Sequence, residues 1–203
     1  AAIGVNINYY LGDTTNFNIM SGNNGANATW DWSTLMINTA TNQRTASVND
    51  ASADPVFSPL GAAQNFEIQD YINQYYNFDG TVKHSQGFRY TTAGSELAVV
   101  TYDSATYDLM QYPFNFSDMI SNTITGGATI DIGTTISTNT ATGTGIVNYD
   151  AHGTLMLPDT TFTNVARIHL RDSVRAPFGG IIGDVDFVVD KYDYYDPTNL
   201  DIP

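Results

Sequence analysis

The chain has 203 residues, a formal net charge of −14 at pH 7 and no cysteine. The negative charge argues against a nucleic-acid partner, because nucleic-acid phosphates would be repelled, and the absence of cysteine excludes disulfides, thiolate metal sites and cysteine nucleophiles. No apolar run reaches the about 18 residues that a membrane-spanning helix requires, so no membrane span is expected.

The residue types favour strands over helices. Thr and Tyr suit a pleated surface, and Asn, Asp and Gly suit turns. Glu occurs only at Glu67 and Glu96, and Lys and Leu are also scarce, so the best helix formers are few. No linker rich in Pro, Gly or Ser divides the chain. We therefore predict an all-β fold, an antiparallel β-sandwich of jelly-roll type with at most one short helix, as a single domain over residues 1–203.

The N-terminal stretch reads as a strand with one apolar face. Its alternating row consists of Ile3, Val5, Ile7 and Tyr9. Strict alternation is typical of a half-buried strand. We interpret residues 1–12 as an edge strand, or as a donor strand that assembles with a neighbouring molecule. The small residues at the start resemble the mature end left after removal of an export signal.

Two tryptophans, Trp30 and Trp32, are predicted to share one side of a strand. Such a pair is typical of core or ring packing, and the alternative is a platform that stacks on a sugar ring. Exposure of the two indole rings would distinguish these interpretations.

The middle of the chain gives a series of shorter signals. Residues 61–76 are the only plausible helix but fit a helical stripe only in part, and a strand with a turn fits nearly as well. Asp79-Gly80 is a favourable hairpin turn. Further strands are expected at 87–92, 96–102, 128–138 and 142–149, and an edge strand or a bend is expected at 107–116, where Pro113 interrupts an aromatic run.

The clearest hairpin signal runs from Tyr149 to Val174. Two alternating segments flank the turn residues Pro158-Asp159. In the second segment Ala166, Ile168 and Leu170 alternate with Arg167, His169 and Arg171. We expect the Arg and His row to face solvent, and His152, beside Gly153, to lie in a turn.

No catalytic motif stands out. The sequence has neither an HExxH metal motif nor a GxSxG nucleophile elbow, and His84, His152 and His169 do not pair at helical spacing. The best metal candidates are Asp184, Asp186 and Asp190, because carboxylates suit calcium. The alternative is a solvated acidic edge that blocks unwanted strand pairing. Calcium is the one cofactor for which the sequence offers candidate ligands.

Several motifs, in order and spread over most of the chain, resemble the uncharacterised N-terminal domains of Bacteroidetes proteins exported by the type IX secretion system. The segments that carry the resemblance are Trp30–Leu35, Gln111–Asp118, Gly153–Pro158, Thr161–Ile168, Tyr194–Pro197 and Ile202-Pro203. The resemblance implies a secreted, cell-surface protein and brings no catalytic residue. In such domains a further apolar strand follows the last proline, whereas this sequence ends at Pro203. We expect that the chain was cut there, that a sorting domain was removed, or that a neighbouring subunit completes the sheet.

These observations favour a non-catalytic, secreted module of the bacterial cell surface, acting in structure or adhesion and joined into filaments by strand exchange. Its partners would be further copies of itself or other surface molecules. One alternative is a carbohydrate-binding module that recognises a polysaccharide with Trp30 and Trp32, with or without calcium. The other alternative is a secreted hydrolase.

Overall fold

A computed structural model describes residues 3–10, 23–36, 43–69, 71–103, 107–179 and 183–196, without the side chains of residues 8–10 and 43. Nearly all of this part of the chain is strand. The strands are β1 (Asn6–Tyr10), β2 (Gly25–Asp31), β3 (Gln43–Asp50), β4 (Gln64–Ile68), β5 (Ile72–Phe78), β6 (Val82–Thr92), β7 (Ser95–Tyr102), β8 (Asp108–Gln111), β9 (Met119–Asp131), β10 (Ile136–Leu157), β11 (Thr160–Gly179) and β12 (Gly183–Tyr195). The one helix in the described ranges is the 3₁₀ turn Ser58–Leu60. The prediction of an all-β fold with at most one short helix is confirmed.

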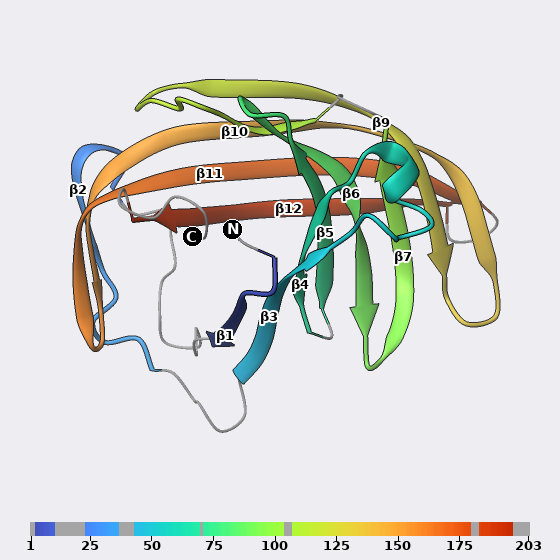
Figure 1. Ribbon diagram of the computed structural model, residues 1–203, viewed down its shortest axis with the longest axis horizontal. Helices are drawn as coiled ribbons and strands as arrows, with labels where there is room; N and C mark the ends of the chain where they lie inside the picture. Colours follow the sequence, from blue (N-terminus) through green and yellow to red (C-terminus); the bar gives the residue numbers. More distant parts are fainter. Residues whose placement is uncertain are drawn as a thin grey trace.

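All twelve strands belong to one open sheet. Its main path runs β1-β3-β4-β5-β6-β7-β9-β10-β11-β12, while β2 pairs with β10 and β8 pairs with β6. The pairs are antiparallel except β2 with β10, which is parallel. Figure 1 shows the sheet folded over itself, with the long strands β10 to β12 running across β4 to β7. The two ends of the path, β1 and β12, are therefore sheet edges.

The core lies between these two layers. Its largest cluster takes buried residues from β6 to β12, including Val100, Ile124 and Val147, which are 0 % exposed. Two smaller clusters form, one around Trp30 of β2 and one around Phe57, which packs against Tyr75 of β5. Alternation along each strand thus sends one row of side chains inward and the other to solvent.

The hairpin predicted around Pro158-Asp159 is confirmed. Strands β10 and β11 pair antiparallel up to Leu157 opposite Thr160. Two details of that prediction are wrong. Arg167 is fully buried, because the Asp150 carboxylate and the Trp30 ring of β2 lie against its guanidinium. His152 lies within β10 rather than in a turn.

The other middle segments differ mainly in their limits. Residues 61–76 include the end of a turn, β4 and most of β5, so the helix is wrong, and there are two strands where the alternative had one strand with a turn. The single strand expected near 128–138 is wrong, because a turn at 132–135 separates the end of β9 from the start of β10. The strand expected near 142–149 is confirmed as part of β10. No helix among the described residues is long and apolar enough to cross a membrane.

Candidate functional site

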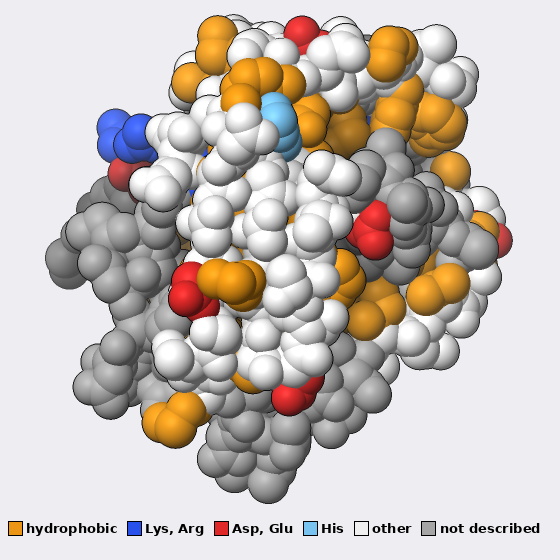
Figure 2. Space-filling view, turned by 90° about the vertical axis from the view of Figure 1, so that its left-hand side faces the viewer, with side chains coloured by type: hydrophobic (Ala, Val, Ile, Leu, Met, Phe, Trp, Pro, Cys, Tyr) orange, Lys and Arg blue, Asp and Glu red, His pale blue; other side chains and the backbone are white. Residues whose placement is uncertain are grey.

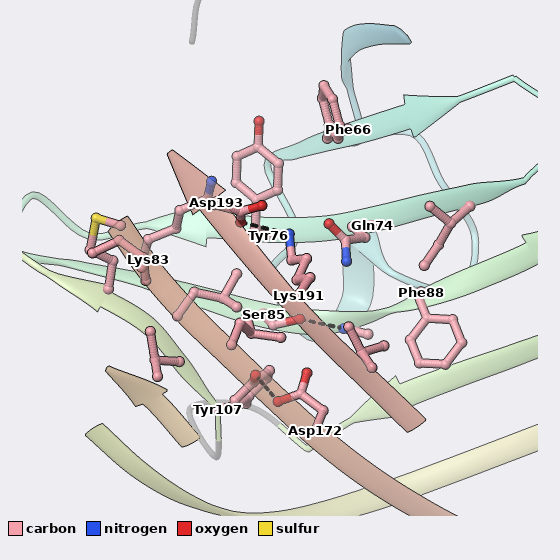
Figure 3. Close-up of a pocket in the computed structure, with 18 of the residues that line it drawn as sticks. Phe66, Gln74, Tyr76, Lys83, Ser85, Phe88, Tyr107, Asp172, Lys191 and Asp193 are labelled. Atoms are coloured by element: carbon pink, nitrogen blue, oxygen red, sulfur yellow. Dashed lines mark hydrogen bonds and ion pairs between the residues drawn. The ribbon is translucent and has the colours of Figure 1, made fainter. Parts of the chain in front are cut away.

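The main candidate site is a hollow between the two layers, beneath the edge strand β12. We call it the β12 groove, and define it as the free edge of β12 together with a cavity of ≈ 100 Å³ that opens beside it. Its floor comes from β4, β5 and β6, and its roof from β11 and β12 (Figure 3). The apolar part of the lining includes Phe66, Ile72, Phe88, Leu170 and Val189.

The inner row of β12 is only half covered. Alternation directs Val185, Phe187, Val189, Lys191 and Asp193 inward, and each of these residues keeps intermediate exposure. Among the described strands β12 pairs with β11 alone. An edge strand presents unpaired N–H and C=O groups along its free side, so this groove combines open backbone groups with an incompletely buried apolar row.

Polar side chains occupy one end of the groove. The Lys191 ammonium lies 2.7 Å from the Asp193 carboxylate, and both residues line the cavity. The Lys83 ammonium sits 4.2 Å from the centre of the Tyr76 ring, a cation–π distance. Figure 3 shows Gln74 on the cavity floor among these groups. The groove is therefore apolar toward the start of β12 and polar toward its end.

A buried acid lies deeper in the same cavity. The Tyr107 hydroxyl donates a hydrogen bond to the Asp172 carboxylate, and both side chains are buried. Burial raises the pKa of the Asp172 carboxyl to about 6, although the hydrogen bond from Tyr107 and the charge of Lys191 act in the opposite direction. Gly145 makes room for the pair, because a Cβ there would lie 2.6 Å from Tyr107 Cε2 and 2.8 Å from Asp172 Oδ1.

Only the second part of the predicted assembly strand forms β1, over Asn6–Tyr10, at the opposite edge of the sheet, while Ile3 and Gly4 lie in a turn. Strand β1 pairs with β3, where Ile7 faces Ala46. Val5 and Ile7 are half-buried and Ile3 is 52 % exposed, while the side chain of Tyr9 lies outside the described residues. Ile3 lines a second hollow together with Tyr76, Lys83 and Tyr112, which also line the cavity of the β12 groove. The two hollows are therefore neighbours.

The two tryptophans pack against the protein. Trp30 is 2 % exposed, and both indole rings meet Tyr194 edge-to-face, at 5.1 Å for Trp30 and 5.0 Å for Trp32. The interpretation as ring packing is confirmed. Because Trp30 is buried, the two rings do not form a flat exposed platform for a sugar. Figure 2, which looks at the end of the molecule where β2 lies, shows hydrophobic side chains in small groups among uncharged polar ones.

The proposed calcium ligands do not converge. Asp186 accepts two hydrogen bonds from the Arg175 guanidinium, at 2.7 and 2.9 Å, and Asp184 lies 3.9 Å from the same group. Asp190 is 2.7 Å from His169 Nε2. Across the described ranges no three His, Asp or Glu side chains cluster so that they could hold a metal ion. The acidic residues of β12 instead form ion pairs with β11.

The histidines are held by packing or by carboxylates. His84 Nδ1 lies 2.7 Å from Asp108 and its Nε2 lies 3.3 Å from Asp79, so both ring nitrogens already have acidic neighbours. His169 stacks on Tyr192 at 4.3 Å, and His152 meets Phe116 edge-to-face. A hydrolytic triad would need a serine hydroxyl on one of these nitrogens, and the described contacts of the three rings include none.

Sequence reasoning missed two polar clusters. The first contains Arg167, which binds the Asp150 carboxylate at 2.8 and 2.9 Å and lies over the rings of Tyr192 and Trp30. The second is the pair of Tyr107 and Asp172. Alternation alone placed Asp172 in the apolar row with Ile168 and Leu170, and that was the available signal that this carboxyl is buried.

Comparisons with known proteins add no identity to this geometry, because no family model matches the chain and neither a curated protein nor a solved structure matches it.

Proposed function

We propose that this protein is a secreted, non-catalytic module of a bacterial cell surface, acting in structure or adhesion, and that its copies join by strand exchange into filaments. The observation that carries the proposal is the open sheet. One of its edges, β12, is 13 residues long and keeps a half-covered apolar inner row. A strand supplied by another molecule would pair with the free backbone groups and complete the burial of that row.

The opposite edge offers a suitable donor. Strand β1 is short and paired only with β3 among the described strands. Exchanging an identical element between molecules is a low-cost route to assembly, and a contact between two different surfaces propagates when the rotation does not close. A head-to-tail filament would follow from one donor strand and one acceptor groove in each copy.

Composition and resemblance support the surface location. A cysteine-free, strongly acidic and Thr-rich chain combines strand propensity with solubility, as an exposed subunit requires. The motifs around Trp30–Leu35 and Gly153–Ile168 resemble exported Bacteroidetes domains. Labelling intact cells with an antibody against the folded protein tests this part, and a label that appears only after lysis would contradict it.

The assembly is tested on the full chain by light scattering after size exclusion and by electron microscopy, over a wide range of protein concentrations. We expect oligomers or filaments with the native sequence and their loss in Ile7→Asp, which places a charge in the donor row. Asn6→Asp is the matched control, because it adds the same charge on the exposed face of β1. Monomers at every concentration would overturn the proposal.

A further inference from the structure

The β12 groove and the N-terminal strand carry the same pattern of side chains. The inner row of β12 reads, from its start, Val185, Phe187, Val189, Lys191 and Asp193. The alternating row of β1 and its approach reads Ile3, Val5, Ile7 and Tyr9. Each row therefore has three consecutive apolar positions followed by a side chain that can form a hydrogen bond.

We propose that β1 of a second copy docks into the β12 groove parallel to β12, in the one register that superposes these two patterns. In this register the paired positions are Ile3 with Val185, Val5 with Phe187, Ile7 with Val189, and Tyr9 with Lys191. The inference rests on the proposed function and deepens it by assigning the acceptor edge, the strand direction and the register.

The polar end of the groove determines whether the docked β1 runs parallel or antiparallel to β12. In the parallel arrangement the residue opposite Lys191 is Tyr9, which carries a hydroxyl, and the Lys191 ammonium lies 2.7 Å from the Asp193 carboxylate. In the antiparallel arrangement over the same span Ile3 would cover Lys191. Covering a charged group with an apolar side chain removes water without replacing its hydrogen bonds, which is costly. The apolar positions match in both directions, so the polar position decides between them.

Charge favours this donor over other segments of the chain. The outer row of β12 includes Asp184, Asp186 and Asp190, and each copy has a formal net charge of −14. Strand pairing between two acidic segments would be repulsive. Residues 3–10 contain no charged side chain, so they can approach the β12 edge without this repulsion.

The donor also gains burial by moving. In its own sheet Ile3 is 52 % exposed and Val5 and Ile7 are only half-buried. In the groove the same three side chains would face the half-covered row that begins at Val185.

Paired cysteines test the register directly, because the native chain has none. A full-length Val189→Cys protein is mixed under mild oxidation with full-length Ile7→Cys, Val5→Cys or Ile3→Cys protein, and cross-linked peptides are identified by mass spectrometry. We expect Ile7→Cys to give the dominant heterodimer with Val189→Cys, at least about tenfold above the Val5→Cys combination. A fourth mixture, of Ile7→Cys with Ala46→Cys, reports a swap onto β3 instead.

The outcomes separate this inference from the function on which it rests. Oligomers whose dominant cross-link joins Ile7→Cys to Val189→Cys support both. Oligomers that cross-link through Val5→Cys and Val189→Cys overturn the parallel register. Oligomers that cross-link only to Ala46→Cys overturn the β12 groove as acceptor and leave strand exchange standing. Monomers without any intermolecular cross-link overturn the proposed function together with the inference.

A substitution pair on β12 gives an independent measurement. Val189 faces the groove, whereas its neighbour Val188 is 63 % exposed on the other face. We expect Val189→Asp to abolish assembly and Val188→Asp to retain it, with circular dichroism and a thermal melt confirming that both variants fold. Equal assembly by the two variants would overturn docking at the inner row.

Discussion

Strands β11 and β12 are neighbours with the same alternation, yet their inner rows are covered differently. The inner row of β11, with Leu170 at 6 % exposure and Val174 at 1 %, is closed. The inner row of β12 remains half-covered along its length. The difference follows from pairing, because β11 has a partner on both sides whereas β12 pairs with β11 alone among the described strands. Side-chain composition is similar in the two rows, so the sheet edge, and not hydrophobicity, determines which row is available to a partner.

The largest expected effect on the free energy of unfolding comes from removing the side chain of Arg167. This residue lies at the end of β11, where both faces of the strand are covered. Its side chain is fully buried against Asp150, whose side chain is 10 % exposed. Arg167→Ala would leave the carboxylate buried without its partner, which typically costs about 3–5 kcal/mol in the free energy of unfolding. Urea denaturation followed by circular dichroism measures this value.

The control for this prediction lies on the same strand. Arg171 is exposed, and Arg171→Ala should change the unfolding free energy by no more than about 0.5 kcal/mol. Similar losses in the two variants would contradict the burial of the Arg167 cluster.

A direct comparison of the two inner rows comes next in size. Leu170→Ala should cost about 2–5 kcal/mol, because it removes a buried side chain and leaves a cavity. Val189→Ala should cost about 1 kcal/mol or less in the monomer, since the side chain is only half-buried and smaller. Both values come from denaturation at protein concentrations where the chain is monomeric.

The same two variants can be compared at protein concentrations where the chain assembles. There the loss of unfolding free energy in Val189→Ala should be larger than in the monomer, because the groove would then be covered. The loss in Leu170→Ala should stay the same. A Val189→Ala penalty that is independent of assembly would place this side chain outside the interface.

The third prediction concerns pH and the buried carboxyl of β11. Burial raises the pKa of Asp172 to about 6 from the ordinary value of 3.8, so folding takes up a proton at this site between the two values. The contribution to stability is fully present below about pH 4 and is lost as the pH rises through about 6. We expect the unfolding free energy to fall by about 2–3 kcal/mol between pH 4 and pH 7.

The matching variant isolates this group. Asp172→Asn keeps an oxygen that accepts from Tyr107 but cannot ionise, so it should remove that part of the pH dependence. Hydrogen bonds from Phe57 and Val56, together with the charge of Arg89, lower the pKa of Asp54 despite its burial, so its contribution is lost below pH 4 and lies outside this window. An unchanged slope between pH 4 and pH 7 in Asp172→Asn would contradict the assignment.

The sequence patterns predicted strands and turns well, but they did not predict which strand faces are covered by other parts of the chain. Alternation located the β10–β11 hairpin and its inner row of Ile168 and Leu170, because a two-residue period is visible within one strand. The same pattern placed Arg167 in solvent, since it could not show that β2 returns to pair with β10 in parallel. Gly153 was a sign of this contact in retrospect, because a Cβ there would lie 1.9 Å from the Ala28 carbonyl oxygen.

The groove was beyond sequence reasoning for a related reason. Residues 61–76 gave mixed periods, and only the folded sheet places Phe66 and Gln74 opposite β12. Whether a row of alternating apolar residues is fully buried depends on the order of the strands in the sheet, and that order is determined by pairing between distant segments of the chain. Strand β1 could be predicted because its alternation lies within a few consecutive residues, although the predicted strand began too early, at Ile3 instead of Asn6.

The smallest expected effect concerns the outer row of β12 and calcium. Asp184 and Asp186 both lie near the Arg175 guanidinium, so a calcium ion would have to displace an arginine that already neutralises them. We expect the thermal midpoint of the native chain to be the same in calcium and in a chelator. Arg175→Ala should leave the midpoint nearly unchanged as well, because the ion pair is exposed and surface pairs contribute little.

The same variant is the most sensitive test for calcium, because it frees both carboxylates from their cation. If the outer row can bind the ion, a calcium-dependent rise of the midpoint should appear in Arg175→Ala and be absent from Arg175→Ala/Asp186→Asn. Calcium stabilisation of the native chain would show that these carboxylates rearrange from their ion pairs, and the acidic edge would then be a metal site. Without it, Asp184 and Asp186 remain in their ion pairs with Arg175, and the outer row of β12 does not act as a calcium site.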